Sequence, residues 1–445
     1  GLFPRRKSEK MNLLSKILTI TTSALLAAGF LVASPSVMPT SASAETIISQ
    51  LGIDIDGDDA GDASGTSVSL SSDGTRVAIG SSKADEPANE TGQVRVFDWD
   101  GAAWVQIGGD INGESNGDNS GFSVSLSGNG ARVAIGAQFN DSIVGGTNRS
   151  NAGHVRVFEL DGTSAWTQVG GDIDGDAAGD QSGVSVSMNS DGSRVAIGAN
   201  FNDGINGADS GHVKVYDYDG TSAWNQVGTD IDGEATGDQF GRAVSLSNNG
   251  SRVAIGGNQN DGNGSNSGHV RIYDYDGTSA WNQVGTDIDG EAAGDRFGFA
   301  VSLMSSDGSR VAIGAIENQG INGAGSGHVR VFQLIGGVWT KLGEDIDGEA
   351  AGDKSGVSVS LSSDGTRVAI GAYLNDNIVD GTNRLDAGHV RLYDWNGSAW
   401  TQVGGDIDGE AAGDYFGYEV ALNSDGTRVA IGAYKNDGNG SDSGH

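Results

Sequence analysis

Short stretches in which apolar and polar residues alternate recur along the chain after residue 44. One region contains four of them in succession, over residues 299–303, 310–315, 328–332 and 338–342. Ser306-Asp307-Gly308, between the first two stretches, is typical of a tight hairpin turn. Because no segment in this region keeps an apolar period of about 3.6 residues, we predict antiparallel strands and almost no helix.

These four stretches form one repeat that occurs seven times. Its marker, Asp-Ile-Asp/Asn-Gly, starts at intervals of 56 to 62 residues, at Asp54, Asp110, Asp172, Asp230, Asp287, Asp345 and Asp406. Four strands in such an interval are typical of one propeller blade, which cannot bury both of its faces alone. We therefore predict an all-β domain over residues 45–445, a seven-bladed β-propeller of four-stranded antiparallel blades.

A linear β-solenoid and a row of separate sandwiches are the alternative folds. A solenoid coil usually has roughly 20–30 residues, and sandwiches would need linkers, which the sequence lacks. The chain ends also suit a closed ring. Residues 47–52 match the fourth-strand segment 400–404, so we expect them to form the outermost strand of the last blade, which we predict to be truncated at the C-terminus.

Residues 1–44 have the order of an export signal. Met11 is followed by Lys16, by an apolar run over residues 17–33 and by Ala42-Ser43-Ala44. We interpret this region as a signal peptide with an upstream extension. A membrane anchor is the alternative, but a spanning helix needs roughly 20 apolar residues. The signal predicts a secreted or cell-surface protein with no membrane span in the mature chain.

Composition narrows the function classes. The 26 basic and 59 acidic residues give a net charge of −33, which argues against nucleic acid and anionic membranes as partners because phosphates are repelled. Without cysteine the chain has no disulfide, thiolate metal site or cysteine nucleophile. The 75 glycines suit a fold with many tight turns.

Three segments of the last repeat carry a family resemblance. Together they resemble the FG-GAP repeat: Gly413-Asp-Tyr-Phe-Gly-Tyr-Glu-Val-Ala-Leu422, Val429-Ala-Ile-Gly-Ala433 and Asn436-Asp-Gly-Asn-Gly-Ser-Asp-Ser-Gly-His445. The resemblance implies an integrin-α-like propeller, and this variant is similar to the secreted bacterial and algal subgroup. Integrin propellers place a calcium loop between their first two strands. This chain has only a Ser-Asp-Gly turn there, so the family's calcium residues cannot be transferred to it.

A different acidic loop begins at each repeat marker. In one copy, carboxylates stand at positions 1, 3, 5 and 9, in Asp287, Asp289, Glu291 and Asp295. Two other copies have the same pattern, in Asp54, Asp56, Asp58 and Asp62 and in Asp172, Asp174, Asp176 and Asp180. Calcium takes about six to eight oxygen ligands, so we predict candidate calcium sites in these loops. The alternative is a solvated turn in which Asp295 accepts hydrogen bonds from backbone N–H groups.

Histidine and arginine also recur once per repeat. We interpret the histidines as structural, because a catalytic centre needs different residues that converge. They are His154, His212, His269, His328 and His389, with Gln93 in the first repeat and His445 in the last. An arginine opens each second strand, as Arg252 does, and we expect it to pair with the loop acids.

These features favour a secreted or cell-surface propeller that binds an extracellular protein or glycan, for example in cell adhesion, and that is not an enzyme. One alternative is a propeller enzyme acting on extracellular polysaccharide, which would need carboxylates or histidines unique to one or two blades near the axis. The other alternative is a structural surface or matrix protein, in which repetition itself is the function.

Overall fold

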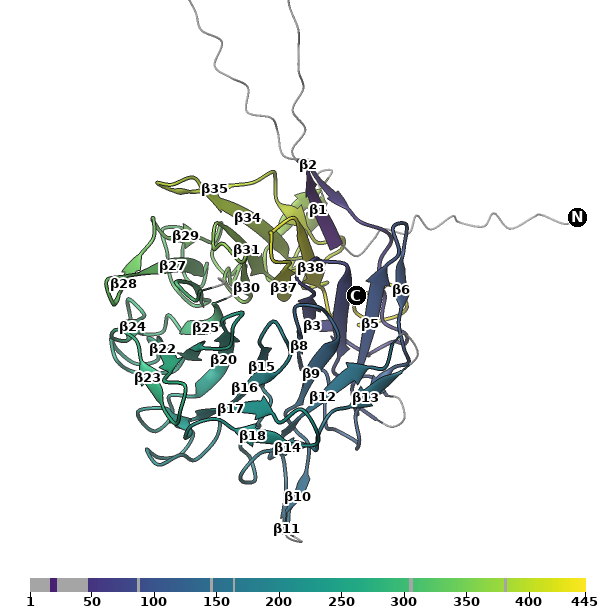
Figure 1. The fold of residues 1–445 in the computed structure, drawn as a ribbon. Helices are drawn as coiled ribbons and strands as arrows, with labels where there is room; N and C mark the ends of the chain where they lie inside the picture. Colours follow the sequence, from purple (N-terminus) through teal and green to yellow (C-terminus); the bar gives the residue numbers. More distant parts are fainter. Residues whose placement is uncertain are drawn as a thin grey trace, which may run out of the picture.

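The computed structural model describes residues 17–21, 47–85, 89–144, 147–162, 165–303, 307–379 and 382–445. These residues form antiparallel sheets arranged as blades around a central axis (Figure 1). No helix occurs in these ranges, so no described segment has the helical length and apolar character of a membrane span. The all-β propeller predicted from the sequence is confirmed.

Each complete blade has four main strands in chain order from the axis to the rim. The innermost strands are β3 (Ser64–Leu70), β8 (Ser123–Leu126), β15 (Ser185–Met188), β20 (Phe240–Leu246), β25 (Phe297–Ser302) and β30 (Val359–Leu361). The second strands are β4 (Arg76–Ser81), β9 (Arg132–Ala137), β16 (Arg194–Ala199), β21 (Arg252–Gly257), β26 (Arg310–Ala315) and β31 (Arg367–Ala372).

The two outer strands of these blades form a hairpin. The third strands are β5 (Gln93–Trp99), β12 (His154–Leu160), β17 (His212–Tyr218), β22 (His269–Tyr275), β27 (His328–Ile335) and β34 (His389–Trp395). The fourth strands are β6 (Trp104–Gln106), β13 (Trp166–Gln168), β18 (Trp224–Gln226), β23 (Trp281–Gln283), β28 (Val338–Lys341) and β35 (Trp400–Gln402).

A fifth, two-residue strand was not expected from the sequence. It is the centre of the repeat marker, in β7 (Ile111–Asn112), β14 (Ile173–Asp174), β19 (Ile231–Asp232), β24 (Ile288–Asp289), β29 (Ile346–Asp347) and β36 (Ile407–Asp408). It pairs with the first half of the third strand, whereas the fourth strand pairs with the second half. The marker is therefore part of the sheet, and its isoleucine is buried in the core.

The prediction of seven four-stranded blades is wrong, because the structure has six complete blades of five strands each. The seventh copy of the repeat supplies only β37 (Glu419–Leu422) and β38 (Arg428–Gly432). They pair with β1 (Ile17–Thr21) and β2 (Ile47–Gln50) in a four-stranded sheet of order β2-β1-β38-β37, which we call the closing sheet. It draws strands from both ends of the chain.

The closing sheet confirms that residues 47–50 supply an outermost strand, since β2 lies at its edge. The neighbour of β2 is β1, whose backbone pairs with both β2 and β38. Of the predicted signal region, only Ile17–Thr21 belongs to the described residues. The rest of that region lies outside them.

The core lies between the sheets and is built from the Val-Ala-Ile motif of each second strand. Because side chains alternate along a strand, Val311 and Ile313 of β26 face the preceding blade and pack with Ala254. Ala312 faces the following blade and packs with Val368 and Ile370 in the same way. The closing sheet continues the pattern, since its Ala430 packs with Val77 and Ile79 of β4.

Hydrogen bonds also join each sheet to the next. Arg252 of β21 donates to Asp274 of its own blade at 2.5 Å and to the Gly308 carbonyl of the next blade at 2.8 Å. The expectation that these arginines pair with the loop acids is therefore wrong, because the register places Asp274 directly opposite Arg252. Arg428 donates to the Gly74 carbonyl at 2.8 Å, so the same contact closes the ring.

Two blades carry an additional hairpin between their second and third strands. The hairpins are β10 (Ser142–Val144) with β11 (Thr147–Arg149) and β32 (Asn377–Val379) with β33 (Thr382–Arg384). The first extends away from the ring in Figure 1. These insertions explain why the repeats that begin at Asp110 and Asp345 are the longest.

Candidate functional site

The acids of each repeat marker point away from the core. Ile288 is only 6% exposed, whereas its neighbour Asp289 is exposed and Asp287 is half-buried. Alternation along the short strand puts both aspartates on the face opposite the isoleucine. Positions 1 and 3 of the loop therefore share one polar face. In the second predicted copy this face carries Asp172 and Asp174. In the first copy residues 54–57 form no strand, and Asp54 and Asp56 are half-buried on either side of the buried Ile55.

The acids at position 9 accept hydrogen bonds from the backbone of their own loops. Asp295 accepts a hydrogen bond from the Ala292 backbone N–H at 3.0 Å and another from the Asn318 side chain at 3.1 Å. Asp180 accepts the equivalent bonds from Ala177 and Asn202. Asp62 likewise accepts from the backbone N–H of Asp59 at 2.9 Å. Asp295 thus accepts a backbone N–H, as the alternative interpretation predicts, but it is buried and not part of a solvated turn.

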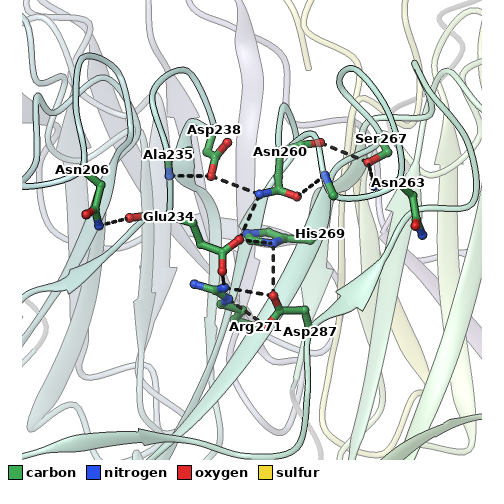
Figure 2. Close-up of polar contacts among 12 residues, drawn as sticks. Asn206, Glu234, Ala235, Asp238, Asn260, Asn263, Ser267, His269, Arg271 and Asp287 are labelled. Carbon is green, nitrogen blue, oxygen red and sulfur yellow. Dashed lines mark hydrogen bonds and ion pairs between the residues drawn. The ribbon is translucent and has the colours of Figure 1, made fainter.

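The acids at positions 1 and 5 of one loop lie in different clusters. Figure 2 shows Glu234, at position 5 of one loop, and Asp287, at position 1 of the next, on either side of Arg271. Arg271 donates to the two oxygens of Asp287 at 2.9 Å each and also forms an ion pair with Glu234. The Nδ1 atom of His269 lies 4.0 Å from a carboxylate oxygen of both acids.

Five such clusters of two acids and one histidine are present among the described residues, with possible ligand atoms all within 4.8 Å of one another. They are Glu114, His154 and Asp172; Asp176, His212 and Asp230; Glu234, His269 and Asp287; Glu291, His328 and Asp345; and Glu349, His389 and Asp406. In the first repeat, Gln93 stands at the histidine position, and Asp58 pairs with Arg95 at 2.5 Å. The predicted loops that begin at Asp172 and Asp287 each contribute to two neighbouring clusters, whereas the loop that begins at Asp54 contributes to none of the five.

The histidines are uncharged at neutral pH. Burial lowers their pKa, and the nearby arginine lowers it further for His154 and His389, to about 4 in both. Burial also lowers the pKa of His212, His269 and His328. Each cluster then holds a neutral imidazole, two carboxylates and one basic side chain from the third strand.

The position of that basic side chain decides which clusters have donors for a metal. Lys214, Arg271 and Arg330 contact both carboxylates of their clusters. Arg156 and Arg391 contact only the glutamate, at 3.3 and 3.6 Å. Within the described ranges, the aspartates of these two clusters make no ion pair. Carboxylate oxygens suit calcium, whereas an imidazole nitrogen suits transition metals such as zinc. Because their aspartate makes no ion pair, these two clusters fit a divalent cation better than the other three, and the carboxylates are the groups that would bind calcium.

A second candidate site lies on the axis, where the innermost strands of all seven sheets line a cavity of about 170 Å³. Small or aliphatic residues form most of its wall, including Ser67, Ser123, Ser185, Val184 and Val357. A few lining residues are larger or charged and differ from blade to blade: Phe122, Arg242, Phe299, Tyr418 and Glu419. Sequence reasoning missed them. The available signal was the pair of residues that follows the Gly at or before the start of each innermost strand, such as Tyr418 and Glu419 after Gly417, because this pair changes between otherwise similar repeats.

Arg242 and Glu419 are the charged residues of the cavity wall. The Arg242 guanidinium lies over the Phe299 ring, 4.4 Å from its centroid. Burial raises the pKa of Glu419 to about 8, although the charge of Arg242 acts in the opposite direction. Burial also lowers the pKa of Arg242 and raises that of Tyr418. At neutral pH, Glu419 is thus largely protonated, whereas an arginine guanidinium is not deprotonated in proteins.

Tyrosines extend from one side of this cavity. The Tyr418 ring lies 4.5 Å from Tyr434 and 5.7 Å from Tyr373, measured between centroids. Tyr415 contacts Tyr373 and Tyr434, and the Lys435 ammonium lies 4.3 Å from the centroid of Tyr415. The sheets that bear Arg242 and Glu419 thus present a cation, a carboxyl group and aromatic surface to one space.

Comparison with known proteins gives a family match and two similar structures. An FG-GAP repeat model matches residues 229–273 and 407–445, and no curated protein matches the chain. The hydrazine synthase of Kuenenia stuttgartiensis has 12% identity and a TM-score of 0.52, over 85% of this chain and 94% of that chain. The periplasmic gluconolactonase PpgL of Pseudomonas aeruginosa has 15% identity and a TM-score of 0.51, over 78% and 86%.

At such low identities the two structures show a shared fold and nothing about activity. The family match falls on the repeats that begin at Asp230 and Asp406. The second matched segment includes the residues on which the resemblance rests. With the ring of antiparallel blades, this confirms the predicted relationship: the chain is a β-propeller that contains FG-GAP repeats.

Proposed function

We propose that this chain is a secreted or cell-surface propeller that binds an extracellular protein or glycan without catalysing a reaction, as in cell adhesion. One observation carries the proposal. The axial cavity gathers side chains that differ between blades, yet among the described residues that line it Glu419 is the single carboxyl group. Glycoside hydrolysis generally uses a pair of carboxyl groups. A wall of one guanidinium, one carboxyl and aromatic rings suits binding better.

Charge and the N-terminal sequence support the proposed partners and location. The net charge of −33 disfavours nucleic acid and anionic membranes. The signal-like sequence of residues 1–44 supports export. Extracellular proteins and glycans remain as the classes of partner.

A calcium ion is the cofactor we propose, in the two clusters around His154 and His389. There the arginine does not contact the aspartate. One oxygen of each aspartate accepts a hydrogen bond from a glutamine, Gln168 or Gln402, and the other oxygen is the one offered to a cation. The other clusters would have to lose an ion pair before they could bind one.

Binding arrays test the main proposal. The full chain is applied to immobilised glycans and extracellular proteins, and soluble polysaccharides are assayed for turnover in parallel. We expect saturable binding to one ligand class and no product. Turnover that is lost in E419Q would contradict the proposal. Self-assembly without any ligand would contradict it in favour of a matrix role.

An enzyme that acts on extracellular polysaccharide is the second candidate. Glu419 favours it, because it is a carboxyl group found in one sheet only, on the axis, and its pKa of about 8 suits a general acid. The single carboxyl in the wall stands against it. The turnover assay described above separates the two candidates.

A further inference from the structure

The axial cavity differs in charge from the rest of the molecule. The chain as a whole carries a charge of −33. The cavity wall has one basic residue, Arg242, and one acidic residue, Glu419. Within the described ranges, neither makes an ion pair within 4.0 Å. With Glu419 protonated, the cavity carries one positive charge that no protein carboxylate neutralises.

We propose that the axial cavity binds a small organic carboxylate, with the ligand's carboxylate group on the Arg242 guanidinium and within reach of the Tyr418 hydroxyl and the Glu419 carboxyl. This inference deepens the proposed function, on which it rests, by naming the ligand class and its site. Arg242 and Glu419 come from β20 and β37, strands of different sheets that face one space. The ligand would therefore bridge across the axis.

The chemistry of the wall selects a carboxylate over other ligands. A planar guanidinium binds a carboxylate through two parallel hydrogen bonds. The Tyr418 phenol and the protonated Glu419 carboxyl are additional hydrogen-bond donors. Together with the guanidinium, the wall thus offers three donor groups to one carboxylate. A cationic ligand would be repelled by Arg242. Phe122 and Phe299 offer apolar surface to the carbon skeleton, which inorganic phosphate lacks.

The volume of the cavity also restricts the size of the ligand. A cavity of about 170 Å³ is smaller than the roughly 300–1,000 Å³ typical of sites for drug-sized ligands. It suits a single small molecule or the end of a chain, such as one acidic sugar unit. A folded protein surface would not enter it.

Glu419 makes binding depend on pH. Arg242 of β20 and Tyr418, the residue before β37, are the titratable groups that face it. The neighbouring strand β3 presents Ser67 and Val68, and the chain at the start of β30 presents Ser358 and Val359, which do not titrate here. Above its pKa, ionised Glu419 repels the ligand and competes for Arg242. With a pKa of about 8, affinity should fall about tenfold between pH 7 and pH 9.

Titration calorimetry with D-glucuronate, D-glucose and inorganic phosphate tests this on the full chain. Glucuronate should bind and glucose, its neutral counterpart, should not. R242Q should weaken glucuronate binding at least tenfold, and R242K, which keeps the charge but not the paired donors, should also weaken it. E419Q should abolish the tenfold loss of affinity at high pH, because an amide does not ionise.

R149Q is the matched control, because Arg149 lies on the outer hairpin strand β11 and donates to the Gly175 carbonyl there. It should bind glucuronate as the unchanged protein does, and a thermal melt of each variant establishes that it is folded. Equal binding of glucose, tighter binding of phosphate, full binding by R242Q, or an unchanged pH profile in E419Q would each overturn the proposal. So would the absence of glucuronate binding in the folded, unchanged protein.

These outcomes differ from a failure of the proposed function. If the protein binds glucuronate but no ligand on the arrays, the cavity assignment is supported and the proposed adhesion function is contradicted. Array binding that R242Q does not alter, together with no response to glucuronate, would overturn the cavity assignment alone.

Discussion

At the scale of single residues, the histidine that opens five of the six third strands is a buried neutral group that lowers stability at low pH. His154 is 2% exposed and its pKa in the folded chain is about 4, against about 6.5 in an unfolded chain. Between these values the unfolded state binds more protons than the folded state. Stability contributed by this group is therefore present above pH 6.5 and declines as the pH falls toward 4.

His154→Gln should remove the loss of stability at low pH that this histidine causes. Glutamine is the residue that the first repeat has at this position, in Gln93. Between about pH 7 and pH 4.5 the unchanged protein should lose about 2 kcal/mol more than the variant, as measured by urea unfolding at both values. Asp174, whose pKa is raised by burial, titrates in both proteins and does not affect the comparison. Identical losses in the two proteins would contradict this prediction.

Gly256 in β21 is required by the approach of the next blade. A Cβ atom at this position would lie 2.0 Å from the Gly298 carbonyl oxygen. Gly256→Ala should thus lower the free energy of unfolding by about 3 kcal/mol or more. Gly171→Ala is the control, because nothing lies within 4 Å of its added Cβ. Denaturant unfolding should separate the two, and equal stabilities would show that the blades adjust.

At the scale of elements, the second strands were predictable and the fifth strands were not. Residues 310–315 are those of β26, because Val-Ala-Ile is an apolar run next to a clear turn. The fifth strand, such as β29, has two residues, too few to show any period. It forms because the chain returns along the third strand after the fourth has ended. The blade count was wrong because a count of markers does not show how many strands each copy completes.

Strand β2 offers an element-scale test. Ile48 packs against the core cluster that contains Val420 and Val429, whereas the adjacent Ser49 is exposed. Ile48→Asp should lower the melting temperature and cost about 1–3 kcal/mol, since a charge would enter an apolar contact. Ser49→Asp should have little effect. If both variants melt alike, β2 is not held to the closing sheet by its inward face.

At the scale of the whole molecule, the acids were predictable as residues but not as sites. The sequence shows Asp287 and Glu291 in one loop, whereas the structure places them in clusters on successive blades. Only the ring brings Glu234 to Asp287, because the two come from different repeats. The axial residues are a similar case. Arg242 and Glu419 are 177 positions apart, and their common cavity exists only once the sheets surround an axis.

Calcium binding should raise the thermal stability of the whole ring. Ions bound in the clusters of His154 and His389 at about 10⁻⁴–10⁻³ M would raise the melting temperature beyond the effect of sodium at equal ionic strength. Asp406→Asn should reduce that excess. Glu344→Gln should not, because the Glu344 side chain is fully exposed and outside these clusters. Equal shifts from calcium and sodium would leave the clusters as ion pairs only.

Each sheet packs its Val and Ile on the preceding sheet and its Ala on the following one. The two faces of a sheet therefore differ, and every contact between sheets has a direction. An arc of blades that has not yet closed therefore ends in two complementary surfaces, one protruding and one receding. Within one molecule they meet each other and the ring is complete. At high concentration during folding, the protruding end of one molecule can instead meet the receding end of another, and such head-to-tail addition does not terminate by itself. Dilution during refolding should consequently favour single rings over chains of molecules.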